Sequence, residues 1–441
     1  MALGSQQAAL DSLTDMANLV HDVFTQGVLP NVRRESKLAM IFQEAGRGDY
    51  RLEGDAMKFA ADYDYATGAM ATSGKLPDHV GLDPAEGSLT PIRRYRRIAK
   101  DNFVVARGSG PGAYEDMGTR LFNILWDSWK SMEIRHALGG SSAILGVCLA
   151  RTSSTVFTVE DFAGHNGTNP LSHISKNAVL GWYDVSEAAA GGAGIVTAIT
   201  LSTGAITVTT AGTWEPTNIL AAGDGIYFAT TNDSTRDYFE LERNLGPNGL
   251  GVVVDPDAGL STAFGVAEST YPRSKPYRKA SVVFDHLELT EHWIQLAQKR
   301  GYDVTPATDI CVAFPSVVAQ AARSVISFQQ QMNLGGTLKG GYDLLNPIMV
   351  ANMPFVPDSF FHPDVCVTLA KEKLFRVNLG GEPDFYANDG SQWRHIADYD
   401  GDEAHVGEYM NFFCTHRGCN SALTGITTDL TDSDFTSLPD Y

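Results

Sequence analysis

The chain has 441 residues, of which 43% are hydrophobic and 19% charged, a balance typical of globular rather than disordered proteins. Its 52 Asp and Glu residues outnumber the 33 Lys and Arg residues and give a formal net charge of −19. Sequence-independent DNA binding depends on Lys and Arg that neutralise phosphates, so this charge excludes that function for the chain as a whole.

The cysteines and the apolar runs exclude further classes. Five cysteines are scattered along the chain, and their odd number argues against a disulfide framework. The first residues lack the basic region and apolar core of a secretory signal. The longest apolar run, residues 141–150, is shorter than the ~20 residues of a membrane span. We expect a soluble, cytosolic product.

The first third of the chain predicts a helix and then a long hairpin. Residues 6–30 place apolar side chains at helical spacing before a Gly and a Pro end the helix. Residues 45–107 have strand-like ends with partial alternation, and their middle is rich in Gly, Asp and Pro. A loop this long inside a compact domain is usually functional. We predict two long strands of a protruding hairpin with a mobile tip.

Residues 113–138 predict the clearest helix. Apolar side chains including Leu121, Leu125 and Met132 form one stripe, and Trp126 and Trp129 widen it. Two glycines follow the last helical residue, as at many helix ends.

The second half predicts mixed structure around a β-rich segment. Residues 186–275 are rich in Thr, Val, Ile and Gly, and their alternation predicts an antiparallel β unit, which we interpret as an inserted domain. Residues 287–301 predict an amphipathic helix, and 308–332 a strand, a Pro turn and a helix. Short strands dominate 347–427, and the acidic end is expected to be mobile.

A basic cluster stands out in this acidic chain. Arg93, Arg94, Arg96 and Arg97 flank Tyr95. In a strand, Arg94 and Arg96 would share one face, and Arg93, Tyr95 and Arg97 the other. The cluster could contact DNA phosphates while Tyr95 stacks on a base, or it could be plain solvated surface. We favour a third interpretation, in which both faces meet acidic surfaces on another copy of the protein.

One motif resembles a dinucleotide site. Gly108, Gly110 and Ala113 fit G-x-G-x-x-G/A between a strand and a helix. Such a site needs a second strand with an acidic residue about 20 positions on, and that position falls near Glu133, inside the predicted helix. A Gly-Pro hinge that starts the helix is the preferred interpretation.

Two other clusters fall short of metal sites. Cys414, His416 and Cys419 lack the second ligand pair of a structural zinc site, so we predict packed side chains there. His286 and His292 lack the H-E-x-x-H spacing. We predict no catalytic, cofactor-binding or metal-binding residue.

The order of these parts resembles the major capsid proteins of tailed phages with the Hong Kong 97-like fold. The hairpin is similar to the family's extended loop, and the 113–138 helix to its spine helix. The C-terminal strands carry N-x-x-C at Asn411 and Cys414. The resemblance implies an α+β fold with an inserted β-rich domain. Its implied parts are an N-terminal arm (1–44), the extended hairpin loop (45–107), a peripheral domain (108–150 and 345–430), an axial domain (151–189 and 276–344), the insertion (190–275) and an acidic tail (431–441).

The resemblance also implies a function. It predicts a structural protein of the virion that assembles in the host cytoplasm into hexamers and pentamers of an icosahedral shell around double-stranded DNA. Scaffolding, portal and decoration proteins are the implied partners, with no membrane and no cofactor. The expected contacts between subunits include the four arginines, and Lys58 and Lys75 of the hairpin. Two alternatives stay open: an encapsulin-like compartment for cargo protein, and a nicotinamide-dependent enzyme that uses residues 108–113.

Overall fold

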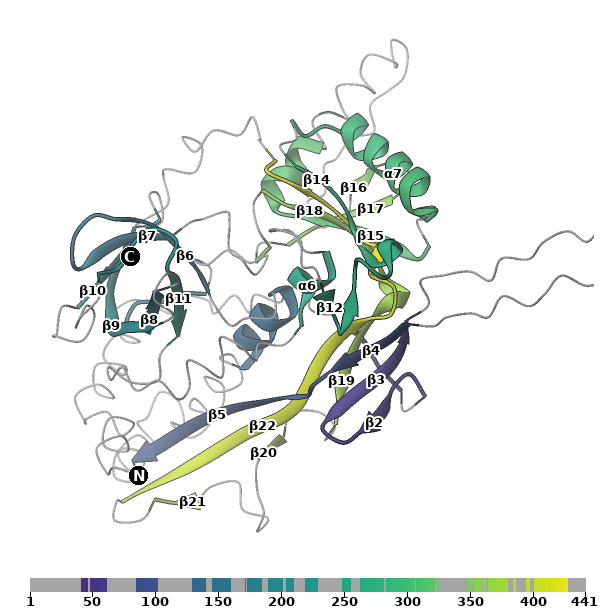
Figure 1. Cartoon of the computed structure of the whole chain (residues 1–441). Helices are drawn as coiled ribbons and strands as arrows, with labels where there is room; N and C mark the ends of the chain where they lie inside the picture. The colour runs from purple at the N-terminus through teal and green to yellow at the C-terminus, as the bar shows by residue number, and fades with distance from the viewer. Residues whose placement is uncertain are drawn as a thin grey trace, which may run out of the picture. The chain divides into compact units, whose positions relative to one another are not determined.

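The structure is a computed structural model, drawn in Figure 1. It describes residues 41–46, 48–61, 85–101, 129–139, 145–159, 171, 173–184, 189–200, 204–209, 219–228, 248–254, 262–280, 283–305, 307–321, 324, 348–350, 353–358, 360–361, 364–379, 384–385, 394–396 and 400–426. The chain divides into two compact units: a smaller one of 1–35, 92–134 and 378–410, and a larger one that takes the remaining residues.

The smaller unit is built on a long antiparallel ribbon. Strand β5 (Ile92–Asp101) pairs with β22 (Gly401–Cys414), from Ile92 opposite Met410 to Asp101 opposite Gly401. Figure 1 shows the two strands side by side along their length. Short strands β20 (Asp384–Phe385) and β21 (Arg394–His395) also pair with β22. Between Ala404 and Met410 every second residue of β22 is buried, so the ribbon has an inner and an outer face.

The ribbon corrects one prediction about the hairpin. Residues 92–101 were expected to form its second long strand, but they pair with the C-terminal strand instead. The hairpin that forms is shorter: β3 (Ala56–Ala61) pairs with β4 (Ala85–Leu89), and β2 (Arg51–Glu53) pairs with β3. Alternation alone identifies a strand but not its partner, which explains the difference. The predicted tip, residues 62–84, lies outside the described part of the chain.

The larger unit contains a six-stranded mixed sheet with a helix packed on it. The strand order is β14 (Tyr277–Ala280), β23 (Ser421–Thr424), β18 (Cys366–Ala370), β15 (Asp309–Ala313), β17 (Met353–Pro357) and β16 (Ile348–Val350). Helix α7 (His286–Arg300) starts at an Asp285 cap and ends at Gly301, whose φ of 70° suits a residue without a side chain. Its buried side chains share a core with Phe284 and Phe355.

The same unit contains a closed barrel. Its strands are β6 (Gly146–Arg151), β7 (Val156–Val159), β8 (Val179–Asp184), β9 (Ala189–Thr200), β10 (Ala205–Val208) and β11 (Gly225–Phe228). Trp182, Phe157 and Ile206 are buried in its core. Strands β9, β10 and β11 lie in the segment predicted to be β-rich, and β6, β7 and β8, which precede residue 186, complete the barrel. That this region is an inserted domain stays a prediction. The last part of the predicted segment, residues 262–275, forms no barrel strand.

Shorter elements complete the larger unit. They are β1 (Gln43–Glu44), β12 (Thr262–Ala263), β13 (Val266–Ala267), β19 (Leu374–Asn378, which ends at the boundary between the units), α6 (Leu250–Val254), and the 3-10 turns η3 (Pro272–Ser274), η4 (Lys371–Lys373) and η5 (Arg417–Cys419).

The predicted helices are confirmed where the structure describes them. Residues 129–138 are helical, and the earlier part of the predicted 113–138 helix lies outside the described residues. Helix α7 matches the predicted 287–301 to within one residue at each end. The strand, Pro turn and helix predicted from residue 308 appear as β15 followed by helical residues 315–321. Across the described ranges, no helix combines the length and apolar character needed to span a membrane.

Candidate assembly surfaces along the arginine strand

The inner face of the ribbon holds Arg94 in a buried ion pair. Arg94 lies opposite Glu408 in the register of β5 and β22, and its guanidinium pairs with the Glu408 carboxylate, with only 1% of either side chain exposed. The guanidinium also lies over the Trp129 ring, 5.4 Å from its centre. Asn378 donates a hydrogen bond from Nδ2 to Glu408 Oε2 at 3.3 Å. A buried charge needs such partners to offset its lost hydration.

This pair corrects the role expected for Arg94. The sequence suggested that its acidic partner belongs to another subunit, but the partner is Glu408 of the same chain, 314 residues away. Both side chains are inaccessible to a second subunit. Arg94 therefore links β5 to β22 through Glu408 and packs against the Trp129 ring.

The outer face of the same ribbon is exposed and aromatic. Arg93 lies opposite Tyr409, and its guanidinium is 5.8 Å from the centre of the Tyr409 ring. Tyr95 is 47% exposed, and its hydroxyl donates to the Tyr409 hydroxyl at 3.1 Å. The Tyr95 ring covers Gly407, where a Cβ atom would come within 2.6 Å of it. These contacts fix Arg93, Tyr95 and Tyr409 as one surface, the outer β5 face.

The structure describes only some of the other basic residues that were predicted to contact a neighbouring subunit. Arg96 and Arg97 lie opposite Val406 and His405 in the ribbon, and their side chains lie outside what the structure describes. Lys75 falls in the undescribed tip. Lys58 is in β3, where its ammonium lies 2.5 Å from Glu53 Oε2 and 2.6 Å from Glu86 Oε1.

Lys58 stabilises the base of the hairpin across three strands. Glu53 comes from β2 and Glu86 from β4, so Lys58 links both neighbours of its own strand. The hydrogen bonds with Glu53 and Glu86 raise the pKa of Lys58, and those from Lys58 and Arg51 lower the pKa of Glu53. The side chains of Lys58, Glu53 and Glu86 are partly or fully exposed, which limits the contribution of their ion pairs to stability.

A polar contact at Asn411 fixes the end of the hairpin. Asn411 is buried next to the ribbon's last paired residue, and its Nδ2 donates to the Thr90 carbonyl at 2.7 Å. Its Oδ1 accepts from the Asn248 amide at 2.9 Å. The residue following β4 is thereby attached to the C-terminal strand. Asn411 was noted in the sequence only as part of a short pattern, which gave no indication of these partners.

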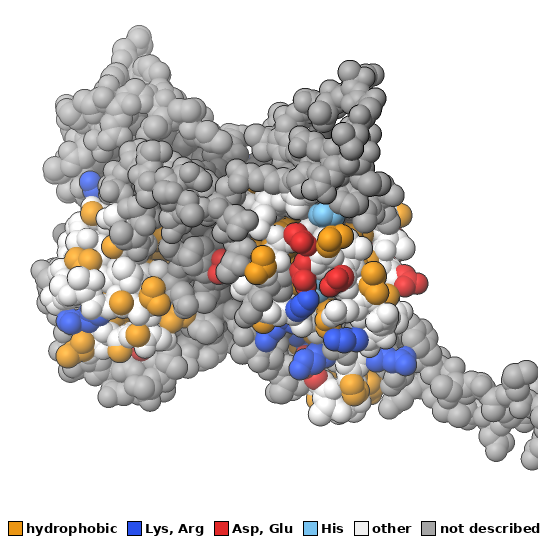
Figure 2. Space-filling model, turned by 90° about the horizontal axis from the view of Figure 1, so that it is seen from above, with side chains coloured by type: hydrophobic (Ala, Val, Ile, Leu, Met, Phe, Trp, Pro, Cys, Tyr) orange, Lys and Arg blue, Asp and Glu red, His pale blue; other side chains and the backbone are white. Residues whose placement is uncertain are grey.

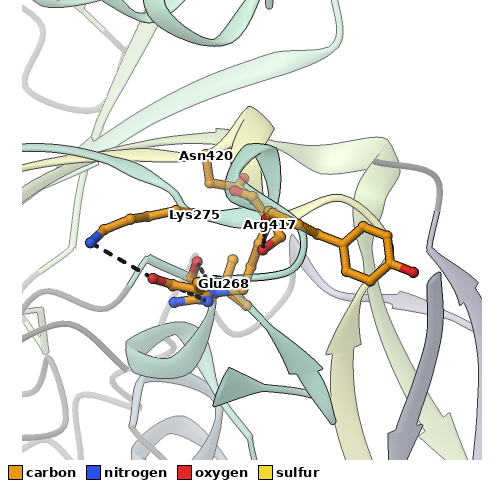
Figure 3. Close-up of polar contacts among 7 residues, drawn as sticks. Glu268, Lys275, Arg417 and Asn420 are labelled. Carbon is orange, nitrogen blue, oxygen red and sulfur yellow. Dashed lines mark hydrogen bonds and ion pairs between the residues drawn. The ribbon is translucent and has the colours of Figure 1, made fainter. Parts of the chain in front are cut away.

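Arg417 forms a second buried cluster that no sequence signal indicated (Figure 3). Its Nε donates to the Val253 carbonyl at 3.1 Å, and one terminal nitrogen donates to Glu268 Oε1 at 2.8 Å. Lys275 lies 3.7 Å from the other Glu268 oxygen. The cluster attaches turn η5 to α6 and to the segment after β13. Gly418 is required beside it, because a Cβ atom would be 1.9 Å from the Arg273 carbonyl oxygen.

The candidate zinc cluster contains buried, protonated thiols. Burial raises the pKa of Cys414 to about 11 and that of Cys419 to about 12. Asn420 donates from Nδ2 to Cys414 Sγ at 3.4 Å. Within the described residues no three His, Cys, Asp or Glu side chains are grouped as metal ligands. The motif at Gly108, Gly110 and Ala113 lies outside those residues.

Comparisons with known proteins give structural likenesses only. No family model and no curated protein matches the chain. It is similar to the capsid of cyanophage A-1(L), with 11% identity and a TM-score of 0.49 over 89% of this chain and 92% of the other. The capsid of Ralstonia phage GP4 gives 9% identity and 0.44 over 92% and 95%, and an encapsulin from Synechococcus elongatus gives 8% and 0.39 over 92% and 95%. Two of these three structures are phage capsids, and the third is an encapsulin complex.

Proposed function

We propose that the chain is the major capsid protein of a tailed phage. In this proposal, copies assemble into hexamers and pentamers of an icosahedral shell that encloses double-stranded DNA. The chain acts as a structural protein, without catalysis and without a cofactor. Heterologous contacts that close by rotation form such rings. Scaffolding, portal and decoration proteins are the proposed partners in the host cytoplasm.

The observation that carries the proposal is the hairpin β3–β4. Its base is fixed by alternately buried side chains, among them Met57 and Phe59 of β3 and Leu89 of β4. The residue after β4 is held further by the hydrogen bond from Asn411 to the Thr90 carbonyl. The residues that connect the two strands, 62–84, are rich in Gly, Asp and Pro. A hairpin with an anchored base and a long polar connection is better suited to contact a neighbouring subunit than to contribute to the core of its own subunit.

The outer β5 face supports the same proposal. Arg93, Tyr95 and Tyr409 contact one another on one face of an acidic protein, and another copy supplies acidic side chains. We propose that this face, rather than both faces of the strand, contacts a neighbouring subunit. The roles of Arg96, Arg97 and Lys75 stay predictions of the same kind.

The proposed domains follow the predicted boundaries with one change. The arm, extended loop, peripheral domain, axial domain and acidic tail are retained. The inserted domain becomes the barrel, so it takes residues from 146 onward that were predicted to belong to the peripheral and axial domains.

Electron microscopy of the expressed full-length chain tests the function. We expect closed shells from the wild type. We also expect a folded subunit without shells when a short Gly-Ser linker replaces residues 62–84, since β3 and β4 stay intact. Normal shells from this variant would refute the role of the hairpin. DNA recovered from native particles supports the capsid, whereas cargo protein without DNA indicates the encapsulin-like alternative. Tight NADH binding by the purified chain would favour the enzyme.

A further inference from the structure

Residues 271–279 form a basic stretch at the edge of the six-stranded sheet. They contain four Lys and Arg residues and no acidic residue, in a chain whose net charge is −19. Arg273 lies in turn η3 and Lys275 follows the turn, and both residues are exposed. The stretch ends in β14, the first strand in the order of the sheet. A positive surface in an acidic protein fits an anionic partner.

Helix α7 adds a further cation beside this stretch. Lys299 lies in the last turn of the helix and is exposed. Its Nζ donates to the Tyr277 hydroxyl at 3.4 Å and lies 4.7 Å from the centre of the Tyr277 ring. Lys275 is two residues before Tyr277, so both lysines lie close to the same tyrosine. We call Arg273, Lys275 and Lys299 the basic edge.

The carboxylate of Glu268 does not balance the charge of the basic edge. Glu268 Oε1 accepts a hydrogen bond from the buried Arg417 at 2.8 Å, and Oε2 lies 3.7 Å from the Lys275 ammonium (Figure 3). One negative charge is thus shared by two cations. The Tyr277 side chain beside Lys299 is neutral at pH 7. Figure 2 shows Lys and Arg side chains gathered in one group, with Asp and Glu side chains in a separate group.

The strand next to β14 leads into an acidic segment. Strand β23 pairs with β14 in parallel, and its last residue, Thr424, lies opposite Ala280. Two residues later the Ile426 amide donates to the Asp364 carbonyl, so the chain is still attached beside the sheet at that point. Residues 427–441 follow, and they contain four Asp and no Lys or Arg. The charge of this segment is opposite to that of the basic edge.

The acidic segment is long enough to reach the basic edge. The path from the level of Ile426 back to Lys275 covers about seven residues along β14, or about 23 Å. Asp434 is eight residues after Ile426, and Asp440 is 14 residues after it. Extended chains of these lengths span up to about 29 Å and about 50 Å. Both aspartates can therefore reach Lys275 while β23 stays paired in the sheet.

We propose that the acidic segment, residues 427–441, binds the basic edge of its own chain. Its aspartates contact Lys275 and Lys299. Exposed ion pairs contribute only about 0–1 kcal/mol each, but a short covalent connection gives a high effective concentration, so several weak contacts hold the segment in place. Double-stranded DNA offers the same lysines a competing anion, but the rest of this acidic chain repels DNA. This inference goes beyond the proposed function and does not depend on assembly.

The reactivity of single lysines tests the contact in the full-length chain. The test variant removes the negative charges of the acidic segment without shortening it, and its four substitutions are Asp429→Asn, Asp432→Asn, Asp434→Asn and Asp440→Asn. A matched control makes the same number of changes in the same segment and keeps the charges: Thr428→Asn, Thr431→Asn, Ser433→Asn and Thr436→Asn. Acetylation at low salt, followed by mass spectrometry, measures the rate at each lysine.

The aspartates are expected to slow acetylation at the basic edge. Lys275 and Lys299 should react at least about threefold faster in the test variant than in the wild type, because a bound carboxylate shields the amine and favours its unreactive protonated form. The control variant should match the wild type. Lys176, an exposed residue before barrel strand β8, should react equally in all three proteins. In about 1 M salt the difference should vanish. Equal rates at Lys275 and Lys299 in wild type and test variant would overturn the proposal.

A carbodiimide cross-link identifies the occupant of the basic edge. This reagent joins a carboxylate to an amine in contact with it, so peptides that link residues 427–441 to Lys275 or Lys299 are expected. In a mixture of ¹⁴N-labelled and ¹⁵N-labelled chains, each linked pair should carry one label only. Linked pairs with both labels would assign the basic edge to the segment of another copy and overturn the proposal. Protection of the lysines only after double-stranded DNA is added would assign the edge to DNA and also overturn it.

These outcomes are independent of the proposed function. Neither measurement requires shells, so a chain that forms no shells but shows the linked peptides supports this contact and refutes the capsid function. Shells from a chain without the linked peptides support the capsid function and overturn the contact.

Discussion

The two faces of strand β5 put neighbouring arginines into opposite environments. Arg94 is buried and pairs with Glu408, whereas Arg93 is exposed and lies against Tyr409. The residues are chemically identical and adjacent in the sequence, and the alternation of the strand alone separates them. A basic cluster in a strand is therefore not one functional unit: one face stabilises the fold, and the other is available for contacts.

The largest expected effect is the loss of the buried pair. Arg94→Ala leaves the Glu408 carboxylate buried without its main partner, so we expect a loss of about 3–5 kcal/mol in the free energy of unfolding. Arg94→Met with Glu408→Leu should regain most of it, because no uncompensated charge remains. Urea denaturation followed by circular dichroism measures both. A double variant as unstable as the single one would show that the pair does more than neutralise a buried charge.

Buried ionisable groups make the stability of the fold depend on pH. Burial lowers the pKa of His173 and of His292 from 6.5 to about 3. Between pH 6.5 and 3 the unfolded chain binds protons at these histidines that the folded chain does not, so their contribution to stability falls as the pH falls. Asp364, whose pKa burial raises to about 6, acts in the opposite direction.

The variant His292→Phe isolates one of these histidines. It keeps a ring against Tyr277 but removes the titration, so its melting temperature should fall less between pH 7 and pH 5 than that of the wild type. Identical profiles for wild type and His292→Phe would contradict the effect of burial.

A charge reversal at Arg93 tests the role of the outer β5 face. Arg93→Glu should leave the urea midpoint close to that of the wild type, because the side chain is at the surface. It should reduce shell formation, since it reverses a charge on the outer β5 face. Light scattering during assembly measures the second effect. A variant that assembles normal empty shells but packages less DNA would instead assign this face to the genome.

The smallest effect is expected at Lys58. Its two carboxylate partners are at least half exposed, and water and salt screen the interaction. Lys58→Ala should shift the urea midpoint by an amount that is barely measurable at low salt and absent at high salt. A shift comparable to that of Arg94→Ala would mean that solvent exposure does not determine how much an ion pair contributes to the stability of this protein.

Elements whose signals are local could be predicted from the amino-acid sequence. Helix α7 has a capping Asp285, an apolar stripe and a terminal Gly301, all within one short segment, and its predicted ends agree with the structure. The two strands at the base of the hairpin and the β-rich character of the barrel were also predictable. Propensity, alternation and capping depend on neighbours in the chain, so they can be recognised without knowledge of the fold.

Which distant segments of the chain pair with one another could not be predicted from local sequence patterns. Strand β5 alternates equally well for a hairpin or for pairing with β22, and the choice depends on residues more than 300 positions away. The burial of Arg94 follows from that pairing, as does its partner Glu408. Arg417 likewise finds Glu268 only because two remote turns pack together. Long-range pairing is selected by the burial and charge balance of the whole core, which no local pattern contains.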